Sequence, residues 1–504
     1  MATAGPTDVV RADVAVVGAG AAGLFAALTA AGEGARVVLV SRSPLAESAS
    51  YWAQGGVVAA LGADDSPELH LGDTIAAGRA ASRPSAASVL CDESPARVEQ
   101  LASLGVRFDA DRHGRLALGL EGGHRARRVA HAGGSATGRR ITRQLSALVA
   151  LDERIEVLEG ASANGLWMSE GRCAGLAVEP ARRRGAVASG HPELAAPLGV
   201  VAGATILATG GAAALWERTT NPRGAIGAGL TLAGAAGAAL ADLEFVQFHP
   251  TALVSEGESD GFLVTEAVRG EGAVLLDASR ERFVDELAPR DHVALAILRR
   301  MRAEGARSVD LDLRSIDMTR FPNVTAALDE ASVDPARELV PVAPAAHYTM
   351  GGIATDLDGR SSVLGLYAVG ECGCTGLHGA NRLASNSLAE CFVFGARAGV
   401  AAAAEPAARH APDSALVRAL SPVPPAVTRA ALWQRAGLER SHEGLRELTR
   451  DPFPLARSIG AAALARAESR GAHQRTDFPA TDAELDGMHF VAKASTEPAL
   501  ERWD

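Results

Sequence analysis

Residues 14–23 read Val-Ala-Val-Val-Gly-Ala-Gly-Ala-Ala-Gly, and this stretch decides the expected fold. An apolar run, Val14 to Val17, leads into Gly18, Gly20 and Gly23, and an alanine-rich helical pattern follows. A strand, a glycine turn and a helix in this order indicate a dinucleotide-binding βαβ unit. The glycines allow the tight turn, the approach of a pyrophosphate and close packing of the helix on the strand. The free N–H groups at the start of the helix would then face the phosphates.

The second strand of this unit, Arg36 to Ser41, leaves the identity of the dinucleotide open. An acidic residue for the ribose is expected about 20 residues after the glycines. Here Ser41 is followed by Arg42, and no carboxylate is present. Taken alone, Arg42 favours NADP over NAD, and an ordinary βα turn without a ligand is the alternative.

The composition narrows the class of protein. A chain of 504 residues with 47% hydrophobic residues can bury a large core in two or three domains. Its net charge of −11 and its lack of a basic tract argue against a nucleic-acid surface. The apolar run from Ala225 to Ala241 is rich in alanine and glycine and is followed by Asp242. We therefore expect a buried helix there and not a membrane span.

The cysteines and the first residues predict a cytoplasmic protein without a membrane partner. Five scattered cysteines suit a reducing compartment better than a disulfide framework. The pair Cys372 and Cys374 has the wrong spacing for zinc or an iron–sulfur cluster, so no metal site is predicted. The segment from Met1 to Arg11 contains no apolar signal region.

The order of the remaining patterns predicts an interrupted α/β fold. Short strands are expected at 155–158, 165–168, 173–178 and 200–208, with a long loop containing Arg182, Arg183 and Arg184 at 180–198. Mixed short strands and helices follow Asp242, and a glycine-rich, strand-like texture returns at His347. Residues 405–424 resemble a linker without a clear strand, and an amphipathic helical tail that includes Ser458 to Arg470 is expected after Ala426.

A set of polar residues stands in apolar or glycine-rich surroundings in the second half of the chain. Each of His249, Arg290, His347 and Arg382 alone is more often structural than functional, because a core histidine or a lone arginine usually has a partner. Together they all donate to anions, and none is spaced like a metal-ligand pair. Since arginine forks suit carboxylates, the set predicts a site for a small dicarboxylate held at both ends. Thr265-Glu266 could donate and accept within the same site.

A series of motifs carries a resemblance to a known family. After the glycine turn come Ala-Gln-Gly-Gly at residues 53–56, Ala-Thr-Gly-Gly at 208–211, Gln-Phe-His-Pro-Thr at 247–251, Thr-Glu-Ala-x-Arg-Gly-Glu-Gly at 265–272, Ala-Pro-Arg-Asp at 288–291, His-Tyr-x-Met-Gly-Gly at 347–352, Leu-His-Gly-Ala-Asn-Arg-Leu-Ala-Ser-Asn-Ser-Leu at 377–388 and Glu-Ser-Arg-Gly-x-His at 468–473. In this order the motifs resemble the succinate dehydrogenase/fumarate reductase flavoprotein family, over nearly the whole chain.

The resemblance implies FAD and a domain plan. It implies an α/β fold with a Rossmann-like FAD-binding domain at 1–242 and 351–404, an α+β capping domain at 243–350 and a C-terminal helical domain at 425–504. It also explains the missing acid, because this family commonly places a serine and a basic residue after the second strand. The NADP interpretation is therefore set aside.

The resemblance assigns the FAD contacts residue by residue. They are Gly18, Ala19, Gly20, Ala21, Ala22, Gly23, Ser41, Arg42, Ala49, Ser50, Trp52, Ala53, Gln54, Gly55, Gly56, Glu371, Ser387 and Leu388. Membrane-complex members carry a histidine that binds FAD covalently where this chain has Ala49, so the cofactor should be non-covalent. Ala228, where the family often has an acid, and a shortened segment from Asp277 to Leu287 depart from the pattern.

Glu121, in Glu-Gly-Gly-His, points to one branch of the family. The dehydrogenases have a neutral residue there, and a buried carboxylate without a cation is costly. Glu121 is therefore useful if the substrate carries an amine, which implies oxidation of L-aspartate to iminoaspartate, with oxygen or fumarate as acceptor and quinolinate synthase as the next enzyme towards NAD. Arg290, Arg382, His249 and His347 would clamp the carboxylates, and Arg290 would assist proton transfer. A soluble fumarate reductase or succinate dehydrogenase-type flavoprotein is the alternative, followed by a flavin-binding protein without turnover.

Overall fold

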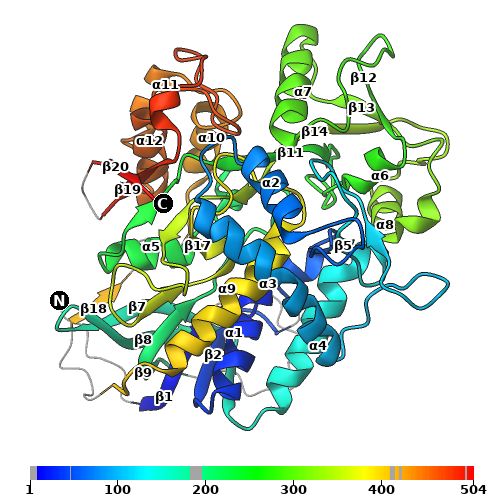
Figure 1. Ribbon diagram of the computed structural model, residues 1–504. Helices are drawn as coiled ribbons and strands as arrows, with labels where there is room; N and C mark the ends of the chain where they lie inside the picture. The colour runs from blue at the N-terminus through cyan, green and yellow to red at the C-terminus, as the bar shows by residue number, and fades with distance from the viewer. Residues whose placement is uncertain (1–7, 46, 182–195, 409–414, 419–422, 494–496) are drawn as a thin grey trace.

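The computed structural model describes residues 8–45, 47–181, 196–408, 415–418, 423–493 and 497–504. A large sheet with its helices forms the lower part of the molecule in Figure 1, a smaller sheet with α7 and α8 lies at the upper right, and the C-terminal helices lie at the upper left. Helices α2 (Pro67–Ala77) and α3 (Pro84–Ser103) lie between these parts.

The large sheet is built on the predicted βαβ unit. Its strand order is β18-β7-β8-β9-β1-β2-β6, and β16 also pairs with β9. Strands β1 (Asp8–Val17), β2 (Val37–Ser41), β6 (Ile155–Glu159), β9 (Leu198–Leu207) and β16 (Leu366–Ala368) run parallel, whereas β7 (Ala161–Ser169) and β8 (Arg172–Pro180) form an antiparallel extension. The strands expected between 155 and 208 are confirmed.

Small residues let the helices of this part pack closely. Helix α1 (Ala21–Gly32) lies against α9 (Asn386–Ala403), and a Cβ at Gly399 would lie 2.8 Å from the Ala26 carbonyl oxygen. Helix α4 (Thr137–Leu151) also contacts α1. The return of the chain at 366–403 therefore completes the same layer that residues 8–41 begin.

One prediction about the linker is wrong. Residues Ala415–Arg418 form β18, which pairs antiparallel with β7, so the segment 405–424 does contain a strand. Proline content had hidden this strand, because it sits at the sheet edge, where neighbouring prolines are tolerated. Most of the loop at 180–198, with its three arginines, lies outside the described residues.

The smaller sheet is antiparallel and has the order β11-β14-β13-β12. It comprises β11 (Val246–Leu253), β12 (Val274–Leu276), β13 (Val309–Asp312) and β14 (Val340–Thr349). Helices α6 (Ala267–Gly270), α7 (Arg290–Glu304) and α8 (Pro322–Glu330) accompany it, and Val264, Val293 and Leu311 belong to its own core. The mixed pattern expected after Asp242 thus forms a separate α+β unit.

The C-terminal region is less helical than predicted. Helices α10 (Ala426–Arg435), α11 (His442–Leu448) and α12 (Pro454–Ala465) are present, but α12 ends before Arg466 and the chain continues into β19 (Met488–Ala492) and β20 (Ala499–Arg502). In the segment that follows α12, Arg466, Glu468 and Arg470 are buried, and Glu468 forms ion pairs with both arginines, while Arg466 also pairs with the distant Glu244. Strand β19 pairs with β10 (Leu240–Ala241), which joins this region to the FAD-binding part.

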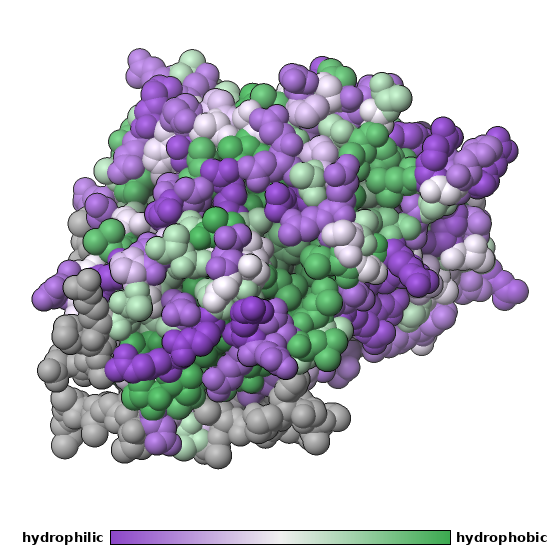
Figure 2. Space-filling model, turned by 60° about the horizontal axis from the view of Figure 1, so that its bottom comes forward, coloured by the Kyte–Doolittle hydropathy of each residue, from purple (hydrophilic) through white to green (hydrophobic). Residues whose placement is uncertain are grey.

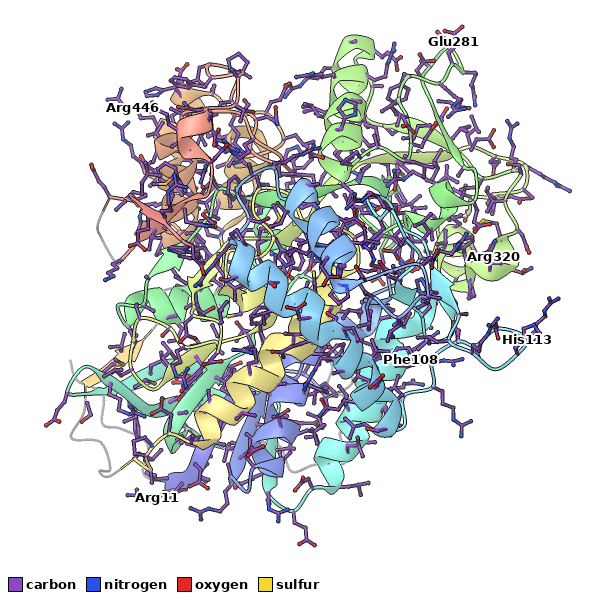
Figure 3. All side chains as sticks on the ribbon, in the orientation of Figure 1. Arg11, Phe108, His113, Glu281, Arg320 and Arg446 are labelled. Carbon is purple, nitrogen blue, oxygen red and sulfur yellow. The ribbon has the colours of Figure 1, made fainter. Side chains whose placement is uncertain are left out.

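The apolar run at 225–241 is only partly helical. It forms α5 (Ala228–Ala235) and then β10, and among the described residues no helix is long and apolar enough to cross a membrane. Hydrophilic and hydrophobic residues are interspersed on the face that Figure 2 presents. Charged side chains such as Glu281 and Arg446 project outward at the periphery, and His113 lies at the tip of an outlying loop (Figure 3).

Short elements complete the fold. They are β3 (Val57–Val58), β4 (Leu118–Gly119), β5 (Val129–Ala130), β15 (Gly352–Ala354) and β17 (Gly373–Cys374), with single 3-10 turns η1 (Ala49–Trp52), η2 (Gly134–Ala136), η3 (Ala213–Leu215), η4 (Met318–Arg320), η5 (Gly370–Cys372) and η6 (Ala483–Leu485). The turns η1 and η5 matter most here, because both carry predicted cofactor contacts.

Candidate active site

The glycine turn between β1 and α1 has the geometry of a phosphate cradle. Gly18 has φ +110°, and a Cβ there would lie 2.3 Å from the carbonyl oxygen of Ala208. A Cβ at Gly23 would lie 1.9 Å from the Gly18 carbonyl oxygen, so the helix can approach the strand only with glycine at this position. Among the described residues, a Cβ built on Gly20 would have only the Ser50 hydroxyl within 4 Å, at 3.3 Å. The chain thus leaves space in front of α1, where its free N–H groups favour an anion.

The segment around η1 closes one side of this cradle. Ser50 accepts a hydrogen bond from the Ala21 backbone N–H at 3.1 Å, which ties η1 to the start of α1. Gln54 is buried and donates to the Leu263 carbonyl at 3.0 Å, and among the described residues its Oε1 atom has no hydrogen-bond partner. A buried amide oxygen without a partner is rare and suits a ligand that supplies a donor. The cradle and this oxygen both fit a dinucleotide such as FAD.

The other predicted cofactor residues surround the same end of the sheet. Ala19, Ala21 and Ala22 are buried at the start of α1, Ser41 ends β2, and Arg42 and Trp52 are exposed. Gly56 packs so closely on Ala130 that a Cβ would lie 2.5 Å from its carbonyl oxygen. Ser387 and Leu388 stand in the first turn of α9. Helix α9, which packs on α1, thus begins with two of the predicted cofactor residues.

Glu371 is a buried carboxyl group in η5. Its Oε1 accepts hydrogen bonds from the backbone N–H of Thr349 at 2.9 Å and from the Thr349 hydroxyl at 3.1 Å. Burial raises the pKa of Glu371 to about 7, although the bonds from Thr349 favour its charged form. Glu371 therefore connects the cofactor side of the site to the end of β14.

Two arginines from different parts of the chain meet at one side-chain oxygen. Gln247 Oε1 accepts from Arg290 Nη1 at 3.1 Å and from Arg382 Nη2 at 3.0 Å. The amide of Gln247 is itself fixed, because its nitrogen donates to the Arg382 carbonyl and to Asn381 Oδ1. Arg382 is buried and stands over the Tyr348 ring at 4.7 Å, and burial together with the Arg290 charge lowers its pKa to about 10. The guanidinium groups of Arg290 and Arg382 therefore lie close together, on either side of Gln247 Oε1.

Glu266 balances this positive charge. Its Oε2 accepts from Arg290 Nε at 2.7 Å and lies 3.7 Å from Arg269 Nη2. Although burial alone favours the neutral acid, the charges of Arg290 and Arg269 outweigh it and lower the pKa of Glu266 to about 2. Thr265, its neighbour, is buried too. Glu266 is thus an ionised carboxylate between the buried Arg269 and the partly buried Arg290.

The two predicted histidines face each other across the smaller sheet. The rings of His249 and His347 are 5.3 Å apart and nearly perpendicular. Strand β14 carries a bulge where Gln247 pairs with Tyr348 but Phe248 pairs with Ala346, and this bulge re-aims His347. Burial and the nearby arginines lower the pKa of both imidazoles well below the usual value, so both are neutral. His249 accepts from the Thr251 N–H through Nδ1, which leaves Nε2–H as a donor.

A cavity of about 160 Å³ opens between the arginines. It is lined by Asp73, Ala76, Ala77, Arg79, Gly122, Gly123, Glu266, Pro289, Arg290, Asn381, Arg382, Leu383 and Ala384. Glu121 does not line this cavity: its Oε2 accepts from the Ser385 hydroxyl at 2.6 Å, and a Cβ on Gly55 would lie 3.7 Å from its Oε1. Glu121 therefore lies between the cavity-lining glycines that follow it and the cofactor segment at 49–56.

The comparisons with known proteins now place the chain. Residues 13–388 match the family described as FAD binding domain, and residues 444–502 match the fumarate reductase flavoprotein C-terminal family. The L-aspartate oxidase of Agrobacterium fabrum is 45% identical over 93% of this chain and 91% of its own length, and that of Caulobacter vibrioides is 45% identical over 96% and 97%. The chain belongs to the L-aspartate oxidase family.

Solved structures agree with this assignment to a family of flavoproteins. E. coli quinol fumarate reductase superposes with a TM-score of 0.85 at 28% identity, covering 98% of this chain and 97% of that one. Mycobacterium smegmatis Sdh1 in complex with UQ1 gives 0.82 at 30% identity, covering 99% and 95%. The chain is an FAD-dependent oxidoreductase with the fold expected from its motifs.

The site also contains residues that the sequence analysis did not predict, and Gln247 is the first of them. Gln247 joins the two arginines, yet it was noted only as part of the motif around His249. A signal was available, because residues two apart on a strand point to the same side and Gln247 lies two before His249. The cavity is also lined by Asn381, which stands directly before Arg382 in the motif at 377–388, and by Arg79, which belongs to none of the quoted motifs.

Proposed function

We propose that Arg290, Arg382, His249 and His347 hold L-aspartate by its two carboxylates while Glu121 meets its ammonium group. The single observation that carries the proposal is the meeting of Arg290 and Arg382 at Gln247 Oε1, beside a cavity that both arginines and Glu266 line. A four-carbon dicarboxylate can bind the remaining N–H groups of both guanidinium groups, while Gln247 Oε1 keeps the two forks ordered.

The neutral histidines complete the clamp. Each can donate one N–H to a substrate carboxylate without adding a charge to a site that already contains three guanidinium groups. The Nδ1 atom of His347 lies 2.7 Å from the Thr220 hydroxyl, which fixes the ring and leaves its other nitrogen for the substrate. Holding the substrate at both ends orders the Cα–H bond before reaction, and such orientation contributes strongly to rate.

Glu121 supplies the selectivity for an amine. Its carboxylate is held by Ser385, three residues after Arg382, so an ammonium group beside a clamped carboxylate can reach it. Succinate has no group for this carboxylate to bind, whereas L-aspartate has. Glu121 is partly buried, and the substrate ammonium would provide an opposite charge for its carboxylate.

The reaction removes a hydride from Cα and a proton from nitrogen to give iminoaspartate. The glycine turn and the segment around η1 would hold FAD, which would supply the two-electron chemistry that links the substrate to oxygen or fumarate. Arg290 and Glu266 form the proton-handling pair, because Glu266 is ionised and Arg290 reaches from it into the cavity. The ammonium must lose its proton before the C=N bond forms. Because a carboxylate with a pKa of about 2 is too weak a base to keep that proton, the pair passes it on to solvent, and Glu266 stabilises the guanidinium charge of Arg290.

The product suggests the next step. Iminoaspartate is unstable, so the proposal includes quinolinate synthase as the partner that consumes it, on the route to NAD. FAD is bound non-covalently, since Ala49 offers no ring nitrogen to the cofactor. The cytoplasmic location expected from the cysteine content stays a prediction.

The experiment replaces Glu121 by glutamine in the FAD-loaded enzyme and measures two activities. We expect Glu121→Gln to lower kcat/KM for L-aspartate by about tenfold or more, because it removes a charge-assisted contact, while fumarate reduction by a reduced dye is retained. The matched control is Glu281→Gln, an exposed change far from the cavity (Figure 3). Equal loss of both activities in Glu121→Gln contradicts the assignment of Glu121 to the amine.

A further inference from the structure

Two consecutive residues after α2 adopt a conformation that side chains rarely tolerate. Arg79 has φ +56° and Ala80 has φ +59°, both in the left-handed region. Two such non-glycine residues in succession persist only where their surroundings hold them, and they occur preferentially at functional sites. Arg79 also lines the cavity that contains Arg290 and Arg382.

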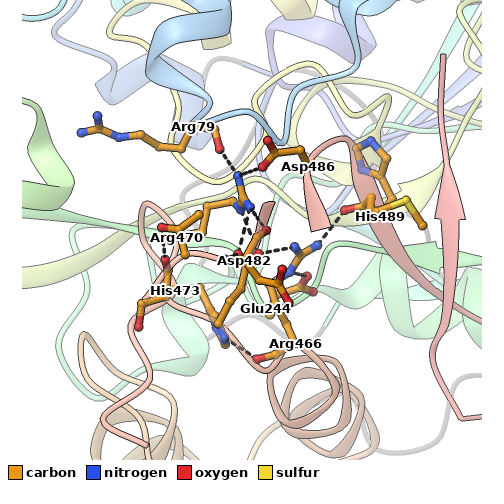
Figure 4. A network of polar contacts seen from close by, with 12 residues as sticks. Arg79, Glu244, Arg466, Arg470, His473, Asp482, Asp486 and His489 are labelled. Atoms are coloured by element: carbon orange, nitrogen blue, oxygen red, sulfur yellow. Dashed lines mark hydrogen bonds and ion pairs between the residues drawn. The ribbon is translucent and has the colours of Figure 1, made fainter. Parts of the chain in front are cut away.

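Hydrogen bonds from the C-terminal region hold the backbone carbonyl groups of Arg79 and Ala80. Arg470 Nη1 donates to the Arg79 carbonyl at 2.7 Å, and the Gly487 N–H donates to the Ala80 carbonyl at 2.8 Å. Arg470 is in turn fixed by Glu468, at 2.8 and 2.9 Å, and by Asp486 at 2.7 Å (Figure 4). Because Arg470 and Glu468 are buried, the backbone at 79–80 rests on a rigid support.

The Arg79 side chain reaches from this support to the smaller sheet's unit. Its Nε lies 3.1 Å from Asp291 Oδ2 and its Nη2 lies 3.2 Å from Asp291 Oδ1, a bidentate fork. Asp291 stands in the first turn of α7, next to Arg290, and its side chain is only 9% exposed. The fork thus connects the C-terminal support to the start of the helix that carries Arg290.

We propose that Arg79 and Asp291 are positioning residues that set the place of Arg290 relative to Arg382. The inference rests on the proposed function, since it concerns the same carboxylate clamp. Arg382 belongs to the FAD-binding part and Arg290 to α7, so the separation of the two guanidinium groups depends on how these parts meet. A dicarboxylate fits only one separation, and small displacements of positioned groups are costly for rate.

An ordinary surface ion pair is the alternative, and such pairs contribute little. Three features distinguish the Arg79–Asp291 pair: the bidentate geometry, the burial of Asp291 and the strained backbone that aims Arg79. A surface pair would leave the clamp unchanged when it is removed. A positioning pair would change binding of every ligand that uses both arginines.

A double-mutant cycle on the FAD-loaded enzyme tests the proposal with Arg79→Met, Asp291→Asn and the double variant. We expect each single change to lower kcat/KM for L-aspartate about tenfold, mainly through a higher KM, and the double variant to be no worse than the single ones. Arg79→Lys keeps the charge without the fork and should recover part of the activity; it also carries the test if Arg79→Met does not fold. Additive effects in the cycle, or unchanged kinetics with the fork removed, would overturn the proposal.

The control is Arg314→Met, which removes a bidentate fork to Asp312 that lies within the smaller unit and away from the cavity. Its kinetics should match the wild type, and FAD content and the thermal midpoint should be similar in all variants. The cycle is also run with fumarate, which needs both arginines but no amine contact. If the wild-type enzyme does not oxidise L-aspartate, the proposed function is contradicted. If the two substitutions have additive effects on fumarate reduction, this inference alone is contradicted.

Discussion

Arg290 donates its Nε hydrogen to Glu266 Oε2 across 2.7 Å, inside a cavity that both residues line. This contact turns the Arg290 fork so that Nη1 points to Gln247 and to the space shared with Arg382. Because the pKa of Glu266 is lowered to about 2, its carboxylate is ionised over the whole physiological range. The contact therefore orients the Arg290 guanidinium group and places a negative charge beside it.

Replacing Glu266 by glutamine should lower turnover with both L-aspartate and fumarate. The amide cannot balance two guanidinium groups or receive a proton, and general acid–base partners typically contribute about 100-fold or more. The measurement is kcat for both reactions in FAD-loaded protein. Glu271→Gln, an exposed change on the same segment, is the control and should leave kcat unchanged. Wild-type turnover in Glu266→Gln would contradict the role given to this pair.

Replacing Gln247 by leucine should weaken binding of every dicarboxylate. The amide orders both forks, and without it Arg290 and Arg382 lose a shared acceptor in a buried site, at a cost of about 1–3 kcal/mol. We expect KM for L-aspartate and the inhibition constant for succinate to rise together by about tenfold. A rise in KM for L-aspartate with an unchanged inhibition constant for succinate would contradict this role, because it would show that Gln247 contacts the amine and not the carboxylates.

The glycine turn predicts a cofactor defect that leaves the fold intact. A Cβ at Gly20 meets only the Ser50 hydroxyl at 3.3 Å, so Gly20→Ala should fold, yet its methyl group would stand where the pyrophosphate approaches. We expect FAD affinity to fall about tenfold or more while the thermal midpoint of the apoprotein is unchanged. Gly32→Ala, at the other end of the same helix and with nothing within 4 Å, should keep FAD. Equal FAD affinity in both variants would contradict the cradle.

The neutral histidines predict how stability depends on pH. The folded-state pKa of His347 lies well below 6.5, so the unfolded chain binds a proton that the folded chain does not as pH falls through 6.5. Stability due to this group is therefore present above pH 6.5 and lost below it, by up to about 1.4 kcal/mol per pH unit. Denaturant unfolding of the apoprotein between pH 7 and 5 should show a shallower slope in His347→Asn.

The exposed His113, replaced in the same way, supplies the control for that titration. Its variant should keep the wild-type slope, because the substitution leaves His347 and the residues around it in place. Identical slopes in the wild type and His347→Asn would mean that His347 is not held neutral.

The sequence predicted the parts of this molecule that depend on local patterns. The glycine turn, the strands between 155 and 208 and the polar set at His249, Arg290, His347 and Arg382 follow from spacing and residue type. The strand β18 and the end of α12 did not, because their geometry depends on partners far along the chain, such as β7 and Glu244. Gln247 and Arg79 were missed for the same reason, since their roles come from side chains that only the fold brings together.

Hydride transfer from L-aspartate to FAD is the reaction proposed for this chain, and it can be measured directly. The direct measurement mixes purified, FAD-loaded protein with L-aspartate without oxygen and follows the yellow flavin absorbance, with succinate in a parallel sample. We predict that L-aspartate bleaches the flavin rapidly and that succinate does so far more slowly or not at all. Bleaching by succinate together with none by L-aspartate would contradict the account.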